Sequence, residues 1–320
     1  MSSAKEVRSD QMPHQREQPP ADGMQKTVID RLKGAGLEAE LRVLQAIRTR
    51  KGWFASGCPQ YLDRDDEDKL REYDALAEFR LAVDVGDNGD GVAVEALLAI
   101  EVKRSNKDPW VVLRRGSSGF FNDEREALTA FRVFNPRENR FLGVRKAPGR
   151  TYIEIGQQSL RGRRLAWEEG YGLRELKGKA DSGGNRGFSA LVSACKAAES
   201  VAELHERCWM QGASWNFSYV TPVVVLDAQL FAVGIDRQGE LAVQRAPYST
   251  VRFHFQSKCN SREVYLVDVV TLEALPRYLE NVEAGVPKVA DALVSARNDN
   301  LQPEEARTMI DFAARRRYTG

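Results

Sequence analysis

The sequence predicts an α/β fold in which a mixed β-sheet is flanked by helices. Segments with apolar residues at helical spacing alternate along the chain with short runs of strand-forming residues. One run, VAVEALLAIEVK at 92–103, is nearly continuous in apolar residues, which is typical of a central strand covered on both faces. With 320 residues, 42% of them hydrophobic, the chain is long enough for one large domain with an insertion.

The N-terminal part contains a tail and then a helix. Residues 1–25 are polar and include three prolines, so we expect them to be disordered. A helix is predicted within 26–50, where Glu40 falls inside the stripe of apolar residues that face the core. The residues of this stripe have helical spacing: Leu37, Leu41, Leu44 and Ile47. A short strand is then expected between Gly52 and Gly57.

The central part of the chain predicts an antiparallel hairpin. Its first strand covers 72–83, where apolar residues alternate, and its second covers 92–103. The turn-forming sequence VGDNGDG at 85–91 joins the two strands. The acidic segment 61–72 before them is interpreted as a connection.

Beyond this hairpin we expect a short strand at 110–113 and an irregular or partly helical insertion over about 114–186, with a helical pattern at 122–134. A helix at 188–208 leads to further strands and a second helix. These are predicted within 221–236, 241–246, 251–256 and 262–270 for the strands, and 271–282 for the helix. The domain would span 26–295, and 296–320 would form a helical tail with its helix at 303–317.

Several classes of protein are disfavoured by the composition. No apolar run approaches the roughly 18 residues of a membrane span, and the first thirty residues do not resemble a secretory signal. The cysteines are scattered and the three histidines are dispersed, which disfavours a zinc site or a disulfide framework. The expectation is a cytoplasmic protein with four reduced thiols: Cys58, Cys195, Cys208 and Cys259.

The charge is unevenly distributed along the chain. The net charge is +1, but residues 101–190 contain 19 Lys and Arg against 11 Asp and Glu. A basic surface that could contact phosphates is one interpretation, and an ordinary solvated face is the other. The arginines considered for phosphate contact are Arg114, Arg115, Arg161, Arg163 and Arg164.

Four residues could converge to form a site. Glu101 and Lys103 are two apart at the end of the apolar strand, so their side chains share one face. Asp74 lies on the preceding strand, and Glu40 lies on the first helix. Oxygen ligands of this kind suit Mg²⁺, with Mn²⁺ able to substitute. A metal with a nearby lysine is sufficient for hydrolysis of a phosphodiester.

The succession Glu40, Asp74 and Glu101–Val102–Lys103 resembles the PD-(D/E)XK, or restriction-endonuclease-like, nuclease superfamily. Segments 56–77 and 100–113 are also similar to a group of prokaryotic nuclease-like proteins, and 221–280 is more loosely similar. The resemblance implies a restriction-endonuclease-like sheet. In this sequence Tyr73 stands before Asp74, where the superfamily signature has a proline.

The resemblance also implies roles for the matched residues. Asp74, Glu101 and the Val102 carbonyl would bind the metal, Glu40 would complete its site, and Lys103 would position the attacking water. Glu72, two residues before Asp74 in the chain, would support these metal ligands. The resemblance to this superfamily further implies a Mg²⁺-dependent endonuclease whose substrate is double-stranded DNA.

Two alternatives stay open beside the nuclease. The first is a nucleic-acid-binding or protein-interaction module on the same fold without catalysis. The second is a purely structural charge pair between Glu101 and Lys103. A homodimer or a partner protein is compatible with each of them.

Overall fold

A computed structural model describes residues 22–63, 65–66, 69–84, 91–105, 108–114, 131–135, 140–142, 146–147, 150–151, 169–176, 186–208, 215–236, 238–255 and 264–298. The chain divides into two compact units, Met1–Glu38 and Ala39–Gly320. The first unit contains helix α1 (Asp22–Ala35), which ends before Gly36. Gly36 has φ of +87°, a conformation that favours glycine and stops the helix there. Of the expected tail, residues 1–21 lie outside the described ranges.

Helix α2 (Leu37–Arg48) forms where a helix was predicted, but it buries a different stripe. The buried side chains are Ala39, Val43 and Ile47, whereas Leu41 is 57% exposed. These three residues are spaced four apart, and Val43 and Ile47 pack against the sheet, so this row defines the inner face of α2. The prediction that Leu37 and Leu41 face the core was therefore wrong, and Glu40 lies beside the buried row.

Three antiparallel strands follow α2. Strand β1 (Trp53–Gly57) pairs with β4 (Ala75–Asp84), and β4 pairs with β5 (Gly91–Arg104), as predicted for the hairpin. The segment interpreted as a connection instead forms a small hairpin of β2 (Gln60–Asp63) and β3 (Lys69–Glu72). Asp74 consequently lies in the bend between β3 and β4, one residue before the strand on which it was expected.

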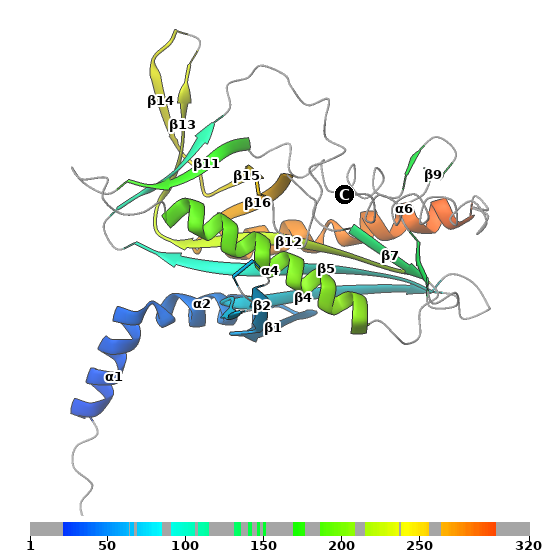
Figure 1. Ribbon diagram of the computed structural model, residues 1–320, viewed down its shortest axis with the longest axis horizontal. Helices are drawn as coiled ribbons and strands as arrows, with labels where there is room; N and C mark the ends of the chain where they lie inside the picture. Colours follow the sequence, from blue (N-terminus) through cyan, green and yellow to red (C-terminus); the bar gives the residue numbers. More distant parts are fainter. Residues whose placement is uncertain are drawn as a thin grey trace, which may run out of the picture. The chain divides into compact units, whose positions relative to one another are not determined.

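A helix and two parallel strands complete this part of the sheet. Helix α4 (Arg186–Cys208) leads to β12 (Trp215–Asp227), which runs parallel to β5. On its other side β12 pairs in parallel with β16 (Val264–Thr271). Strands β5, β12 and β16 therefore end at the same edge of the sheet (Figure 1).

Further strands extend the sheet, whose main path runs β1-β4-β5-β12-β16-β15-β11-β6-β13-β14. A strand at 131–135 stands where the end of a helix was predicted from 122–134, so that part of the helix prediction was wrong. Much of 114–186, and the predicted helix at 303–317, lie outside the described ranges. The remaining strands of this sheet are β6 (Trp110–Arg114), β7 (Phe131–Asn135), β8 (Arg140–Leu142), β11 (Glu169–Glu175), β13 (Leu230–Ile235), β14 (Leu241–Arg245) and β15 (Tyr248–His254). Strands β9 (Lys146–Ala147) and β10 (Arg150–Thr151) form a separate antiparallel pair.

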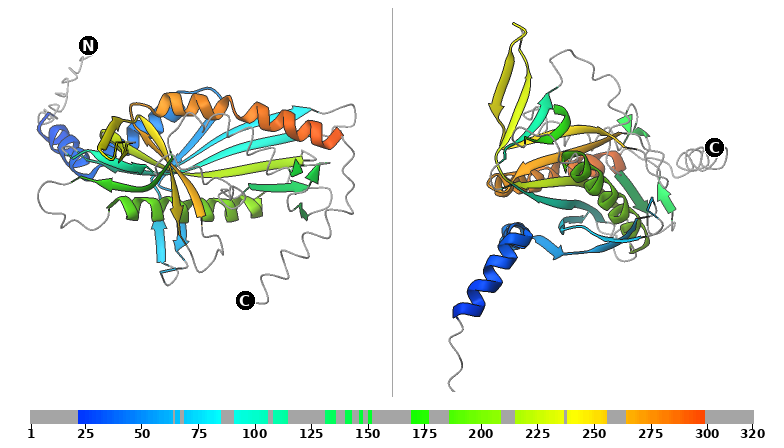
Figure 2. Two further views of the ribbon diagram at one scale, coloured as in Figure 1. Left: turned by 90° about the horizontal axis from the view of Figure 1, so that it is seen from above. Right: turned by 60° about the vertical axis from the view of Figure 1, so that its left-hand side comes forward.

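Helices cover both faces of the sheet. Figure 2 (left) shows α4 on one face and the C-terminal helices α5 (Leu275–Glu283) and α6 (Val286–Asn298) on the other. Because side chains alternate along β5, Leu97 and Ala99 pack with α4, while Leu98 and Ile100 pack with α2 and α5. The structure is thus a mixed α/β sheet flanked by helices, as the sequence predicted.

Candidate functional site

The last residues of β5 carry a buried carboxylate beside an ammonium group. Glu101 is only 7% exposed, and it is on the face of the strand that Leu97 and Ala99 share. The Lys103 Nζ donates a hydrogen bond to Glu101 Oε1. An unpaired carboxylate would be costly at this position, so Lys103 offsets part of the desolvation of Glu101.

Asp74 lies next to Glu101 because Ala75 and Ile100 are opposite each other in the β4–β5 register. Its Oδ2 accepts a hydrogen bond from the Val102 N–H at 2.5 Å. Its backbone carbonyl accepts a second one from the Cys58 N–H at 3.2 Å. The bend before β4 is therefore held from both sides, by the end of β1 and by the end of β5.

Glu40 reaches the same region from α2. Burial is the main cause that raises the pKa of Glu40, and the Asp74 carboxylate raises it further, whereas Lys103 lowers it. Such mutual effects require short separations between the charged groups. Helix α2 and the two strands therefore bring Glu40, Asp74 and Lys103 into one electrostatic neighbourhood.

The site holds more negative charge than its lysine neutralises. Burial, followed by Asp74 and Glu40, raises the pKa of Glu101 to about 7, although Lys103 acts in the opposite direction. Burial also raises the pKa of Asp74, against the effects of the Val102 N–H and Lys103. A group of carboxylates with raised pKa values favours the uptake of a proton or a further cation.

The donor set is suited to a hard divalent cation. Among the residues that the structure describes, no three His, Cys, Asp or Glu side chains are grouped closely enough to hold a metal by themselves. Mg²⁺ requires less, since it keeps several waters and takes only one or two carboxylates. Asp74 and Glu101 can supply these, and the excess negative charge fits a dication.

Glu72, expected to support the site, is at the end of β3 and is exposed. Its Oε1 accepts a hydrogen bond from Gln60 Nε2 at 2.8 Å. Its charge raises the pKa values of Asp74 and Glu40, so it contributes to the field of the site. It belongs to the β2–β3 hairpin and not to β4, so the prediction that it shares a strand with Asp74 was wrong.

An ion pair between Asp63 and Lys196 attaches this hairpin to α4, and neither residue was predicted from the sequence. Asp63 is 3% exposed and accepts hydrogen bonds from Lys196 Nζ at 2.7 Å and Arg71 Nε at 2.6 Å. Asp63 belongs to the acidic segment 61–72, whose charged side chains were expected to be exposed to solvent. Lys196 belongs to α4, more than a hundred residues later in the chain. Only their packing reveals a buried ion pair.

Cys58 is another neighbour of the site that the sequence did not indicate. It has φ of +50° and an exposed side chain at the end of β1. Burial is the main cause that raises the pKa of its thiol, followed by Glu40, Glu72 and Asp74. The thiol is therefore kept protonated near neutral pH, which disfavours a role as a nucleophile.

Of the arginines considered for phosphate contact, Arg114 is described by the structure, and it does not lie at this site. Arg114 is on β6, and its guanidinium donates to Gln244 Oε1 at 2.9 Å. In the order of the sheet, four strands stand between β6 and β5. The cations closer to the site are Arg42 and Arg104, which lie 3.4 and 3.8 Å from the Asp227 carboxylate. The other candidates lie outside the described ranges: Arg115, Arg161, Arg163 and Arg164.

Comparisons with protein-family models, curated proteins and solved structures returned no match. Among the helices that the structure describes, none has the length and apolarity needed to cross a membrane.

Proposed function

We propose that this chain is a metal-dependent phosphodiesterase that cleaves nucleic acid. The observation that carries the proposal is the meeting of Glu40, Asp74, Glu101 and Lys103 at one end of the sheet. They come from α2, the bend before β4 and the end of β5. Burial raises the pKa of Glu101 to about 7, with further contributions from Asp74 and Glu40 despite the neighbouring lysine, and a bound cation would stabilise these carboxylates in their ionised form.

The order of the elements supports a restriction-endonuclease-like core for this site. A helix, three antiparallel strands, a second helix and a parallel strand follow one another as α2, β1, β4, β5, α4 and β12. The strand with Glu101 and Lys103 is central in this group, as the resemblance to the PD-(D/E)XK superfamily implies.

Each residue has a role that follows from its position. Asp74 and Glu101, with the Val102 carbonyl, would hold Mg²⁺, which when bound supplies a water of lowered pKa and charge stabilisation at the phosphate. The nearby Glu40 carboxylate would add to the negative charge that favours a dication. Lys103 shares the face of Glu101, so its N–H groups can orient that water and stabilise negative charge developing on phosphorus. The Val102 N–H fixes the Asp74 carboxylate in the orientation that this requires.

Double-stranded DNA is the substrate that we propose, with a cytoplasmic location. The excess of Lys and Arg over residues 101–190 is consistent with attraction of phosphates. A cleavage panel tests the function: supercoiled, nicked, linear and single-stranded DNA, each with Mg²⁺ or Mn²⁺. The variants are Lys103→Ala and, as a control for the loss of an exposed lysine, Lys51→Ala.

The expected result is metal-dependent cleavage that Lys103→Ala reduces by about 10²–10³ and Lys51→Ala leaves unchanged. Cleavage by Lys103→Ala at the wild-type rate would show that this assignment is wrong. Calorimetry with Mg²⁺ distinguishes the alternative. If wild type and Asp74→Asn bind Mg²⁺ equally, a non-catalytic binding module is the better description.

A further inference from the structure

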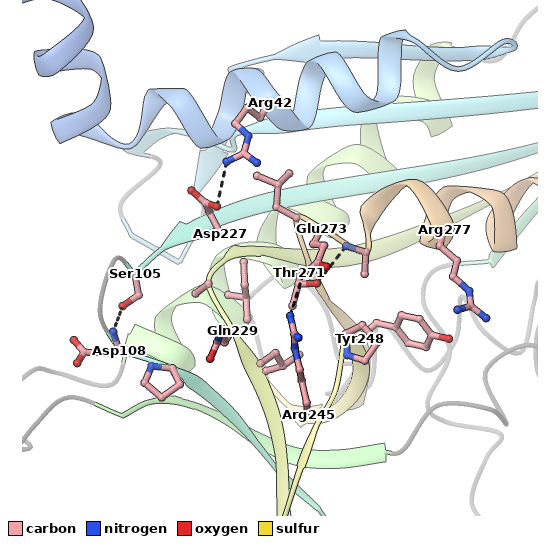
Figure 3. Close-up of a pocket in the computed structure, with 17 residues that line it drawn as sticks. Arg42, Ser105, Asp108, Asp227, Gln229, Arg245, Tyr248, Thr271, Glu273 and Arg277 are labelled. Carbon is pink, nitrogen blue, oxygen red and sulfur yellow. Dashed lines mark hydrogen bonds and ion pairs between the residues drawn. The ribbon is translucent and has the colours of Figure 1, made fainter.

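A cavity of about 910 Å³ lies at the carboxyl ends of β12 and β16 (Figure 3). Asp227 and Thr271 end these strands, and the segments that lead into β6, β13 and β15 form the other walls. Its volume is within the range of pockets that bind small ligands. In open α/β sheets, ligands bind beyond the carboxyl ends of the strands. Glu40, Asp74, Glu101 and Lys103 do not line it.

Three arginines line this cavity, and their side chains have weak ion pairs or none among the described residues. Arg245 pairs with Glu273 at 3.1 Å, and both side chains are largely exposed, at 64% and 82%. Arg42 pairs with Asp227 at 3.4 Å and is 54% exposed. Exposed pairs of this kind contribute little, so either arginine can exchange its partner for a phosphate.

Arg277 is the third, in the first turn of α5 at the rim of the cavity (Figure 3). Within the described part of the chain, no hydrogen-bond or ion-pair partner is found for its exposed guanidinium. An arginine in this state can bind a phosphate in a bidentate manner without first breaking another contact.

The rest of the lining is apolar, aromatic and neutral polar. Leu226, Leu230 and Leu272 form buried apolar wall, and in Figure 3 the Tyr248 ring lies between Arg245 and Arg277. A phenol ring at a wall can stack on a planar base. Gln229, Ser105 and Asp108 add hydrogen-bonding groups on the opposite side.

The charges of the lining narrow the class of ligand. The three arginines are balanced by three carboxylates, from Asp108, Asp227 and Glu273. A cavity with balanced charge does not attract an isolated anion strongly. It suits a ligand that offers a phosphate to the arginines, hydroxyl or amino groups to the carboxylates, and a flat apolar surface to the tyrosine.

We propose that this cavity binds a nucleotide. Arg277 binds the phosphate, the Tyr248 ring beside it stacks on the base, and Arg245 and Asp108, beyond the ring, bind polar groups of the base or sugar. The ligand is either a free nucleotide or one nucleotide unit of a strand. Arg42 is two residues from Glu40 on α2, and Asp227 is opposite Arg104 in the β5–β12 register, so the cavity and the proposed active site lie near the same end of these strands.

Isothermal titration calorimetry of the full chain tests this inference without depending on cleavage. The protein carries Lys103→Ala and is kept free of metal. The probes are the four deoxynucleoside 5′-monophosphates, inorganic phosphate and a single-stranded hexanucleotide. The variants are Arg277→Gln and Tyr248→Leu, with Tyr248→Phe to keep the ring. Arg80→Gln is the control for the loss of a largely exposed arginine, because Arg80 is 55% exposed, pairs with Glu95 and does not line the cavity.

We expect at least one nucleotide to bind more tightly than inorganic phosphate. Arg277→Gln should weaken this binding about tenfold or more, as expected for a charge-assisted hydrogen bond, and Arg80→Gln should not. Tyr248→Leu should weaken it, and Tyr248→Phe should not. Binding of monophosphates indicates a free nucleotide, and binding of the hexanucleotide alone, with the same dependence on Arg277, indicates a strand.

Three results would overturn the inference: binding of none of the probes, binding that Arg277→Gln does not change, or inorganic phosphate bound as tightly as any nucleotide. Arg277 is exposed, so we expect its variant to fold, and its melting temperature checks this. Metal-dependent cleavage by the wild type is measured separately. Failure of nucleotide binding at this cavity is therefore distinguishable from failure of the proposed function.

Discussion

Replacing Glu101 with Gln should make the metal-free protein less sensitive to alkaline pH. In the folded chain, burial and the neighbouring carboxylates raise the pKa of Glu101 from 4.5 to about 7. Below about pH 4.5 the group is protonated in both the folded and the unfolded states, so it imposes no penalty. As the pH rises towards 7, ionisation favours the unfolded chain, and the stability associated with the protonated group is lost.

The magnitude follows from the size of the shift. A difference of about 2.5 pH units corresponds to about 3 kcal/mol, at 1.36 kcal/mol for each unit. For a domain of this size, 1 kcal/mol shifts the melting temperature by about 2–4 °C, so the expected effect is about 6–12 °C. Glu101→Gln also removes the ion pair with Lys103, but this pair forms only when Glu101 is ionised, and its effect is already included in the pKa of Glu101. The difference between two pH values therefore isolates the effect of ionisation.

Calorimetric unfolding in the presence of a chelator, at about pH 5 and about pH 8, measures this effect. The wild type should lose more stability between the two values than Glu101→Gln. Glu95→Gln, the same exchange earlier on β5, controls for the loss of a carboxylate. Added Mg²⁺ should then stabilise the wild type at about pH 8 but not Glu101→Gln. If wild type and Glu101→Gln change in parallel with pH, the carboxylate is not destabilised in the way described.

Other substitutions have distinct expected results. Lys103→Ala should reduce cleavage by about 10²–10³ while the protein stays folded, and it should lower the melting temperature more at about pH 8, where Glu101 is ionised, than at about pH 5, measured by paired kinetics and calorimetry. Asp74→Asn should weaken Mg²⁺ binding but keep an acceptor for the Val102 N–H, whereas Asp74→Ala should also lose about 1–3 kcal/mol of stability, measured by urea unfolding. Lys196→Met should destabilise the fold by about 3–5 kcal/mol, because Asp63 stays buried with one cation fewer. Binding of DNA should weaken steeply with salt in a titration, and an affinity that stays flat would contradict phosphate contact.

Local patterns in the sequence were sufficient for much of the sheet. Strand β5 was recognisable because 92–103 is apolar on both faces, and the turn-forming residues at 85–91 predicted its antiparallel partner. The positions of Glu101 and Lys103 followed from the alternation of side chains along one strand. The position of a strand, the position of a turn and the alternation of side chains all depend on residues that are close together in the sequence, so they can be predicted from it.

Features that depend on several elements were predicted less well. The inner face of α2 was misjudged because Leu37 and Leu41 have the right spacing, yet Ala39 and Val43 are small enough to approach the sheet. The β2–β3 hairpin was missed because its residues are mostly polar and exposed. No local pattern in the sequence indicates this kind of strand pairing.

The sequence alone was enough to propose the site residues and to predict the strand on which Glu101 and Lys103 lie. The packing of distant elements decided the pKa of Glu101, which burial raises most and the carboxylates of Asp74 and Glu40 raise further. It also decided the Asp63–Lys196 pair and the cavity lined by Arg277. Burial and the distance between charges depend on how distant segments pack, whereas the order of residues along the chain specifies only neighbours.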